Sequence, residues 1–233
     1  MQAAVLPPPR AILMDALDTL VHFEHPAPHL RDELHKRLGI EVSDAEARAA
    51  IRAEMRHYRA NLHLGRDSDT LAQLRGECAT IMLDHLPPEV RAADLGVVTD
   101  ALVSAIRFEP YPEVVDTLKR LRERDLRLAV LSNWDFSLHA MLDAVGLSEL
   151  VDASVSSAEY GTAKPDPAIF EHALEIVGVP AGDAWHVGDS FDNDVVGARA
   201  AGVTPILVWR RDDEPPVETT VISDLTELLE LLD

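Results

Sequence analysis

Short apolar runs that alternate with amphipathic stretches dominate two parts of this 233-residue chain. Four runs have the length of buried strands: residues 11–14, 126–131, 184–187 and 205–208. The stretches between them have helical spacing, and capping residues stand at the expected helix ends: Asp166, Pro167, Gly146, Gly178 and Gly202. This alternation predicts a parallel sheet, in a doubly wound α/β core formed by residues 1–22 and 109–233.

The segment between the two parts, residues 23–108, has only helical periodicity. Residues 43–46 read Ser-Asp-Ala-Glu, a capping box, and an apolar stripe at spacings of three and four follows it: Ala47, Ile51, Met55, Tyr58 and Leu62. Further helices are predicted over about residues 28–38, 68–85 and 88–107. We therefore expect an all-helical domain inserted after the first strand of the core.

A second stripe on the capped helix consists of arginines: Arg48, Arg52, Arg56 and Arg59. It could attract anions, but the commoner reason for such a stripe is a solvated helix face with paired charges. We expect the second, with Glu46 and Glu54 as the partners.

Charge and cysteine content limit the partners. The formal net charge is −20, from 41 acidic and 21 basic residues, which argues against a nucleic-acid groove or an anionic membrane as partner. Residues 23–108 are nearly balanced, with 11 basic and 14 acidic side chains, so the excess lies in the α/β core. The single cysteine excludes an intrachain disulfide, and no run of about 18 apolar residues is present. We expect a cytoplasmic protein.

Polar residues collect where the predicted strands end: Asp15, Asp18, Thr19, Ser132, Asn133, Asp189 and Asp194. Because the carboxyl ends of parallel strands form the ligand crevice of such folds, one site could contain them all. Carboxylates from separate strands can bind Mg²⁺, and a cation with hydroxyl, amide and ammonium donors suits a phosphoryl group. Lys164, one of only three lysines beside 18 arginines, precedes a predicted helix start and could supply the ammonium.

In this order the motifs resemble those of the haloacid dehalogenase-like (HAD) hydrolase superfamily. The four motifs read Asp-Ala-Leu-Asp-Thr-Leu at 15–20, Leu-Ser-Asn at 131–133, Lys-Pro-Asp-Pro at 164–167, and Gly-Asp-Ser-Phe-Asp-Asn-Asp at 188–194. The resemblance implies a Rossmann-like core with a C1-type helical cap, and a Mg²⁺-dependent phosphatase that acts on a small phosphorylated metabolite through an aspartyl-phosphate.

The resemblance also implies a role for each motif residue. Asp15 would be the nucleophile and a metal ligand. Ser132, the backbone around Asn133, and Lys164 would hold the phosphoryl group. Asp189 would be the second carboxylate on the metal, and Asp194 would be a further ligand or would orient a metal-bound water. The backbone carbonyl of Leu17 would complete the coordination by the protein.

Motif one departs from the family pattern Asp-x-Asp-Gly-Thr, because Leu17 occupies the place of the second Asp and Asp18 that of the glycine. Leucine cannot move a proton, and the loss of a positioned acid or base lowers rates about 10²–10⁴-fold. Asp18 could replace it, and we rank it first because it is the nearest acid in sequence. His22 is a second candidate, and an acyl phosphate substrate would need little acid help.

The sequence leaves two alternatives open. A 2-haloacid dehalogenase also lacks the second Asp, but those enzymes need no metal, whereas this chain has Asp189 and Asp194 in motif four. A degenerate HAD-like protein could bind metal and phosphate without efficient turnover.

Overall fold

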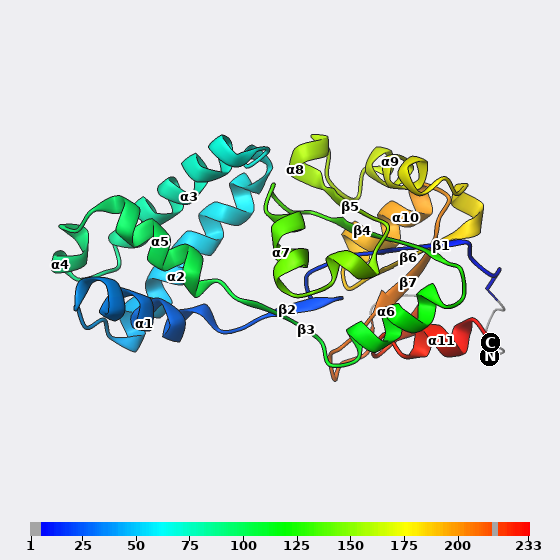
Figure 1. The fold of residues 1–233 in the computed structure, drawn as a ribbon, viewed down its shortest axis with the longest axis horizontal. Coiled ribbons are helices and arrows are strands. Elements are labelled where there is room, and N and C mark those ends of the chain that lie inside the picture. Colours follow the sequence, from blue (N-terminus) through cyan, green and yellow to red (C-terminus); the bar gives the residue numbers. More distant parts are fainter. Residues whose placement is uncertain (1–5, 216–218) are drawn as a thin grey trace. The chain divides into compact units, whose positions relative to one another are not determined.

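A computed structural model describes residues 6–215 and 219–233 of the chain (Figure 1). The chain forms two compact units, one built from the residues up to His22 together with Pro110–Asp233, the other from Phe23–Glu109. We call them the α/β unit and the helical unit. Among the described helices, none combines the length and the apolar character that crossing a membrane would require.

The α/β unit is built on a six-stranded sheet in which every pair of neighbours is parallel. Its order is β5-β4-β1-β6-β7-β8. The strands are β1 (Ala11–Met14), β4 (Arg127–Ser132), β5 (Ala153–Ser156), β6 (Ala184–Gly188), β7 (Thr204–Val208) and β8 (Thr220–Ile222). This confirms the predicted α/β class and its parallel sheet.

The helices of the α/β unit lie on opposite faces of this sheet (Figure 1). They are α6 (Val114–Arg122), α7 (Leu138–Ala144), α8 (Ser157–Tyr160), α9 (Pro167–Val177), α10 (Gly197–Ala200) and α11 (Glu227–Leu231), with turns η2 (Ser148–Leu150), η3 (Ala181–Asp183) and the π-helical η4 (Phe191–Val196). Ala11 and Leu13 of β1 face α9, where they pack with Phe170. Strand β1 is fully buried because it lies between β4 and β6, so its register fixes the point at which Asp15 emerges.

The predicted capping residues of the α/β unit take the expected conformations. The Asp166 side chain accepts a hydrogen bond from the Ala168 amide at the start of α9, and Pro167 occupies the first turn. The three glycines have positive φ angles of 72°, 70° and 74° at Gly146, Gly178 and Gly202. These local signals are confirmed because each depends only on neighbouring residues.

The helical unit contains α1 (Pro26–Leu38), α2 (Asp44–Asn61), η1 (Leu62–Leu64), α3 (Ser68–Leu83), α4 (Pro88–Arg91) and α5 (Leu95–Ala105). The capping box of α2 is present in full, with Ser43 and Glu46 exchanging bonds. The helix predicted over residues 88–107 is wrong as one element: it is broken between α4 and α5, where Asp94 caps a new helix by accepting from the Gly96 and Val97 amides. Strands β2 (Val21–Phe23) and β3 (Phe108–Pro110) form a two-stranded sheet that the sequence pattern did not predict.

The expected pairing of the arginine stripe is corrected by the structure. Arg48 pairs with Asp44, 2.9 Å away, while Glu46 is occupied by the capping box. Glu54 is 3% exposed and hydrogen-bonds the Cys78 thiol instead of an arginine. Its carboxyl group therefore lies in the core of the helical unit, because α2 turns this position toward α3.

Burial raises the pKa of Glu54 to about 7, although the hydrogen bond with Cys78 opposes the shift. Since the folded-state pKa is higher than the unfolded one, its stabilising contribution is complete below about pH 4.5 and is lost as the pH rises through about 7. We expect Glu54→Gln to raise the free energy of unfolding by about 1–2 kcal/mol at about pH 8 and to have little effect at about pH 4.5. Urea unfolding followed by circular dichroism measures this, with exposed Glu89→Gln as control; equal effects at both pH values would contradict it.

Candidate active site

The polar residues of motifs one, two and four emerge side by side from three neighbouring strands. Asp15 follows β1, Ser132 ends β4, and Asp189 follows β6. The amide of Asp15 donates to the Val187 carbonyl at 2.9 Å, which continues the β1–β6 pairing to the last residue before the crevice. The parallel register therefore brings together side chains that lie more than 100 positions apart in sequence.

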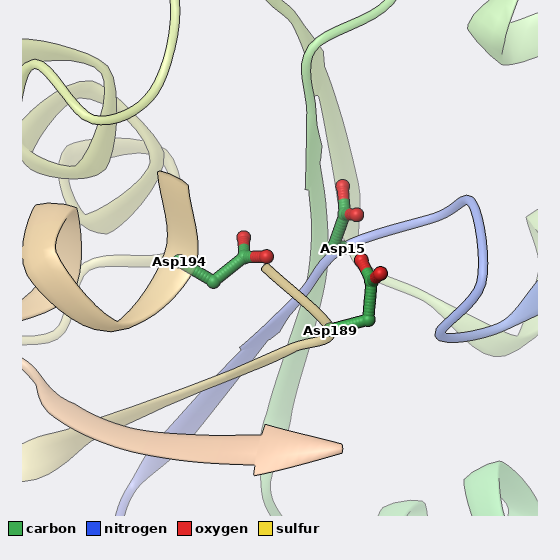
Figure 2. Close-up of side chains that lie close together, drawn as sticks. All are labelled: Asp15, Asp189 and Asp194. Carbon is green, nitrogen blue, oxygen red and sulfur yellow. The ribbon is translucent and has the colours of Figure 1, made fainter. Parts of the chain in front are cut away.

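Three carboxylates meet at this edge of the sheet (Figure 2). Asp15, Asp189 and Asp194 each offer an oxygen, and the three oxygens lie within 4.8 Å of one another. Figure 2 shows the carboxylates of Asp15 and Asp189 next to each other, with Asp194 reaching toward them from η4. Such an oxygen-only set matches the ligands that Mg²⁺ or Ca²⁺ takes in proteins, so the cluster could hold a hard cation.

Lys164 lies between two of these carboxylates. Its Nζ donates to Asp15 Oδ1 at 2.7 Å and to Asp194 Oδ1 at 2.6 Å, and the residue is 4% exposed. A buried ammonium held by two carboxylates stays charged: burial alone would lower the pKa of Lys164, but the two negative charges raise it. The cluster thus contains its own cation.

The two polar residues of motif two have different partners: Ser132 contacts Asp15, and Asn133 contacts Lys164. The Ser132 hydroxyl donates to Asp15 Oδ1 at 2.8 Å. The Asn133 side chain instead binds the backbone of Lys164 twice: its Nδ2 donates to the carbonyl at 2.9 Å and its Oδ1 accepts from the amide at 2.8 Å. Ser132 therefore orients the carboxylate, and Asn133 fixes the loop that carries the lysine.

Asp194 is held by two contacts that the sequence analysis did not assign. His186 on β6 has its Nε2 2.9 Å from Asp194 Oδ1, and the Ser190 amide donates to Oδ2 at 2.9 Å. A carboxylate only accepts, so Nε2 carries the proton. Burial lowers the pKa of His186 and keeps it neutral, although Asp194 opposes the shift. A polar residue within an apolar strand was the signal that could have identified His186.

Gly188 provides the space that the Asp194 carboxylate occupies. A Cβ at Gly188 would come within 2.2–2.6 Å of the carboxylate atoms of Asp194. Real Cβ atoms do not approach other atoms so closely, so glycine is required here by the close approach of η4 to β6.

Burial and neighbouring charges shift the pKa values of the three carboxyl groups by different amounts and in different directions. Burial would raise the pKa of Asp194, but the Lys164 charge and the His186 hydrogen bond lower it well below its usual range. Burial raises the pKa of Asp15, with the Lys164 charge opposing. Among the residues that the structure describes, Asp189 has no such donor, and burial together with the charges of Asp15 and Asp194 raises its pKa to about 7. The carboxyl group of Asp189 therefore titrates near neutral pH.

Metal binding should release the proton of Asp189, because a metal binds the carboxylate and not the acid. We expect the Mg²⁺ affinity of the protein to fall by about tenfold for each pH unit below about 7, and to level off above it. Calorimetric titrations in two buffers of different ionisation enthalpy give both the affinity and the number of protons released. An affinity that does not change between about pH 5.5 and 8.5 would contradict the expectation.

Motif one departs from the family pattern at Leu17 and Asp18, and Asp18 has the backbone conformation expected of the glycine that it replaces. Asp18 has a φ of 58°, in the left-handed region that glycine favours and aspartate tolerates, and its side chain is exposed. Leu17 is half-buried and forms a bridge with Val21. Asp18 is not part of the metal-capable cluster. The His22 ring contacts Tyr111, with centroids 4.9 Å apart.

A second charged group lies beside motif one and was missed by the sequence analysis. Arg210 follows β7 and donates to the Thr19 carbonyl at 3.0 Å and to Glu113 at 2.6 Å. Its guanidinium lies 3.7 Å from the centre of the Tyr111 ring. Burial raises the pKa of Tyr111, and the negative charges of Asp18 and Asp189 add to the shift. Arg210 thus ties the motif-one turn to the segment before α6.

Comparison with known proteins places this geometry in one family. The profile of haloacid dehalogenase-like hydrolases matches residues 9–202. The human haloacid dehalogenase-like hydrolase domain-containing protein 3 is 29% identical over 96% of this chain and 94% of its own length. A glyceraldehyde 3-phosphate phosphatase of Methanopyrus kandleri is 29% identical over 88% of both chains.

A solved structure shares the fold at lower identity. The HAD-hydrolase YfnB of Bacillus subtilis, described as bound to magnesium, has a TM-score of 0.69 at 18% identity, covering 97% of this chain and 99% of its own. At that identity the likeness concerns the fold alone. The match of the family profile to most of the chain, together with the strand-end cluster, leads to the conclusion that this chain belongs to the haloacid dehalogenase-like hydrolase family.

Proposed function

We propose that the protein is a Mg²⁺-dependent phosphatase that hydrolyses a small phosphomonoester or acyl phosphate through an aspartyl-phosphate on Asp15. The observation that carries the proposal is the arrangement around Asp15: two further carboxylates within metal-binding distance, and a buried lysine and a serine that donate to it. A relative named glyceraldehyde 3-phosphate phosphatase supports the reaction class.

The donor set fits a hard cation. The carboxylates of Asp15, Asp189 and Asp194 and the carbonyl oxygen of Leu17 would hold Mg²⁺, since all are oxygen ligands and none is sulfur or nitrogen. When bound, the ion supplies Lewis-acid stabilisation of charge on the phosphoryl oxygens. It would also reduce the repulsion among three carboxylates that Lys164 alone neutralises only in part.

The residues of the chain divide the chemistry among them. A carboxylate oxygen of Asp15 forms a bond to phosphorus while the bond from phosphorus to the leaving oxygen breaks, and the leaving oxygen keeps the electron pair. The Nζ of Lys164 and the Oγ of Ser132 already donate at the nucleophile and would donate to the phosphoryl oxygens. Water then attacks phosphorus, which releases phosphate and restores the Asp15 carboxylate. Asn133 keeps the lysine in place for both steps.

The leaving oxygen needs a proton, and Leu17 cannot donate one. We propose that Asp18 supplies it, by virtue of its exposed position in the motif-one turn. His22 is the second candidate. Asp18→Asn should then lower turnover of an alkyl phosphate about 10²-fold or more, while p-nitrophenyl phosphate, whose leaving group needs little protonation, is affected far less. Steady-state kinetics with both substrates, and with His22→Ala in parallel, measure this; unchanged rates in both variants would exclude both residues.

The helical unit would serve as a C1-type cap that selects the substrate. Its boundaries would be those predicted from the sequence, residues 23–108. The proposal rests on its place in the chain, inserted directly after motif one, and on its being a compact unit by itself. The partner is a small phosphorylated metabolite in the cytoplasm, with no role for nucleic acid or membrane.

The test is an assay of p-nitrophenyl phosphate hydrolysis with and without Mg²⁺, followed by a panel of phosphorylated metabolites. Mg²⁺-dependent release of phosphate supports the proposal. Mg²⁺ binding without turnover of any substrate would indicate a degenerate HAD-like binding protein instead. Release of halide from a 2-haloacid without metal would indicate a dehalogenase, which the three buried or half-buried carboxylates disfavour.

A further inference from the structure

A pocket of about 330 Å³ lies within the helical unit, among α1, α3 and α5. Its polar lining comes from Arg37 on α1, Ser68 and Arg75 on α3, and Thr99, Asp100 and Ser104 on α5. No residue of the four motifs belongs to it. Its volume is at the lower end of the range for pockets that hold small molecules.

Arg37 forms a fixed part of the pocket wall. Its Nε donates to Glu33 Oε2 at 3.0 Å and its Nη2 donates to the Ser104 hydroxyl at 2.9 Å. A serine hydroxyl that accepts a hydrogen bond still has its own proton to donate. Since no acceptor for that proton is found among the described residues, Ser104 can donate to a molecule in the pocket.

Arg75 differs from Arg37 in its partners. Within residues 6–215 and 219–233, its guanidinium has no hydrogen-bond or ion-pair partner, although the residue is half-buried. A guanidinium presents five N–H donors in a planar fork, which matches the two oxygens of a carboxylate or phosphate. The pocket therefore contains a cationic group whose natural counter-ion is not supplied by the neighbouring protein.

The charges around the pocket leave an excess of positive charge. Glu33 is the buried carboxylate of this region, and it is approached by Arg37 at 3.0 Å, Lys36 at 3.9 Å and Arg107 at 3.8 Å. Asp100 has a side chain that is 73% exposed and stands 3.9 Å from Arg37, so water screens its charge. In the lining itself, Arg37 and Arg75 therefore stand against the single carboxylate of Asp100, in a protein whose net charge is −20. An anion is the occupant that this balance favours.

We propose that this pocket is a binding site for a small organic anion carrying a carboxylate or a phosphate, held by the fork of Arg75 and the hydroxyl of Ser104. The site belongs wholly to the helical unit and is additional to the phosphatase site proposed above. Its volume limits the ligand to the size of a small metabolite.

The test is a titration of the full-length, metal-free protein with malonate and, separately, with inorganic phosphate, followed by ¹H–¹⁵N NMR. We expect saturable shifts at the amides of Gly76 and Ser104, with at least one of the two probes. Arg75→Ala should weaken that binding by about tenfold or more, because a charge-assisted bidentate contact is lost. Arg59→Ala removes an exposed arginine of the same unit that does not line the pocket, and should leave the binding unchanged.

Two further variants keep the result interpretable. Arg75→Lys preserves the charge without the fork and should give intermediate affinity. Ser104→Ala leaves both arginines and should weaken binding by a few fold. If only malonate saturates the site, the ligand is a carboxylate. If only phosphate saturates it, the ligand is a phosphate. The absence of saturable shifts with either probe, or equal binding by folded Arg75→Ala protein, would overturn the proposal. Because the readout needs neither metal nor turnover, failure of the phosphatase proposal would leave it unaffected.

Discussion

Replacing Asp15 by asparagine should reduce Mg²⁺-dependent hydrolysis of p-nitrophenyl phosphate by about 10⁴-fold or more. The amide has almost the same shape as the carboxylate, so the folded structure should be kept. It lacks the negative charge that forms the bond to phosphorus, and it removes one of the three carboxylates that could hold the metal. The measurement is the steady-state rate at saturating Mg²⁺, with trapping of the phosphorylated protein by mass spectrometry in the unmodified chain.

The matched control for Asp15→Asn lies in motif four. Asp192→Asn makes the same chemical change at an exposed carboxylate that does not belong to the cluster, two residues before Asp194. Its rate should stay within about twofold of the unmodified protein. Retention of most of the activity in Asp15→Asn would show that Asp15 is not the nucleophile. Loss of activity in both variants would show that the charge of the whole segment matters, and not Asp15 in particular.

Replacing Lys164 by alanine should lower the free energy of unfolding of the metal-free protein at about pH 7.5 by about 3–5 kcal/mol. The Nζ lies 2.7 Å from Asp15 and 2.6 Å from Asp194, and both carboxylates are buried. Without the ammonium, two negative charges lose the cation that compensates them in a region with little water. Denaturant unfolding followed by tryptophan fluorescence measures the change.

The direction of the pH dependence adds a second readout for Lys164→Ala. In the unmodified protein the Lys164 charge keeps the pKa of Asp194 low, so its carboxylate contributes stability above the unfolded pKa. In the variant the carboxylates can become neutral by taking up protons, so the destabilisation should shrink as the pH falls toward about 5. Lys119→Ala, at an exposed lysine of α6, is the control and should change stability by less than about 0.5 kcal/mol. An equal, pH-independent loss in both variants would contradict the role of Lys164 as the internal cation.

The sequence predicted the place of Asp15 at the edge of the sheet better than the contacts within the site. Asp15 ends a run of four apolar residues, and the register of a parallel sheet carries such a residue to the carboxyl edge. Asp194 was ambiguous in sequence, since an acid near a helix start is also a common capping residue. Only the approach of η4 to Gly188 places its carboxylate beside Asp15 and Lys164. The side chain of Asn133 is engaged with the backbone of Lys164, a contact that the sequence did not predict, and phosphoryl binding by the backbone around Asn133 stays a prediction.

The residues that the sequence did not identify act across long separations. Arg210 forms hydrogen bonds with Thr19 and Glu113, which precede it by 191 and 97 positions. His186 contacts Asp194 only because β6 and η4 fold back on each other. Glu54 looked like a solvated partner for the arginine stripe and is buried beside Cys78. In each case the local pattern is compatible with two environments, and the packing of another element selects one of them.

The sequence by itself determined four strands of the core sheet, most of the helices and the order of the motifs. Strand length, helical period and capping residues depend on interactions within a few positions, so they can be read along the chain. The tertiary structure decided which charges are buried together, because burial and electrostatic coupling arise between segments far apart in sequence. The raised pKa of Asp189, the compensation of two carboxylates by Lys164 and the unpartnered guanidinium of Arg75 among the described residues are all results of that packing.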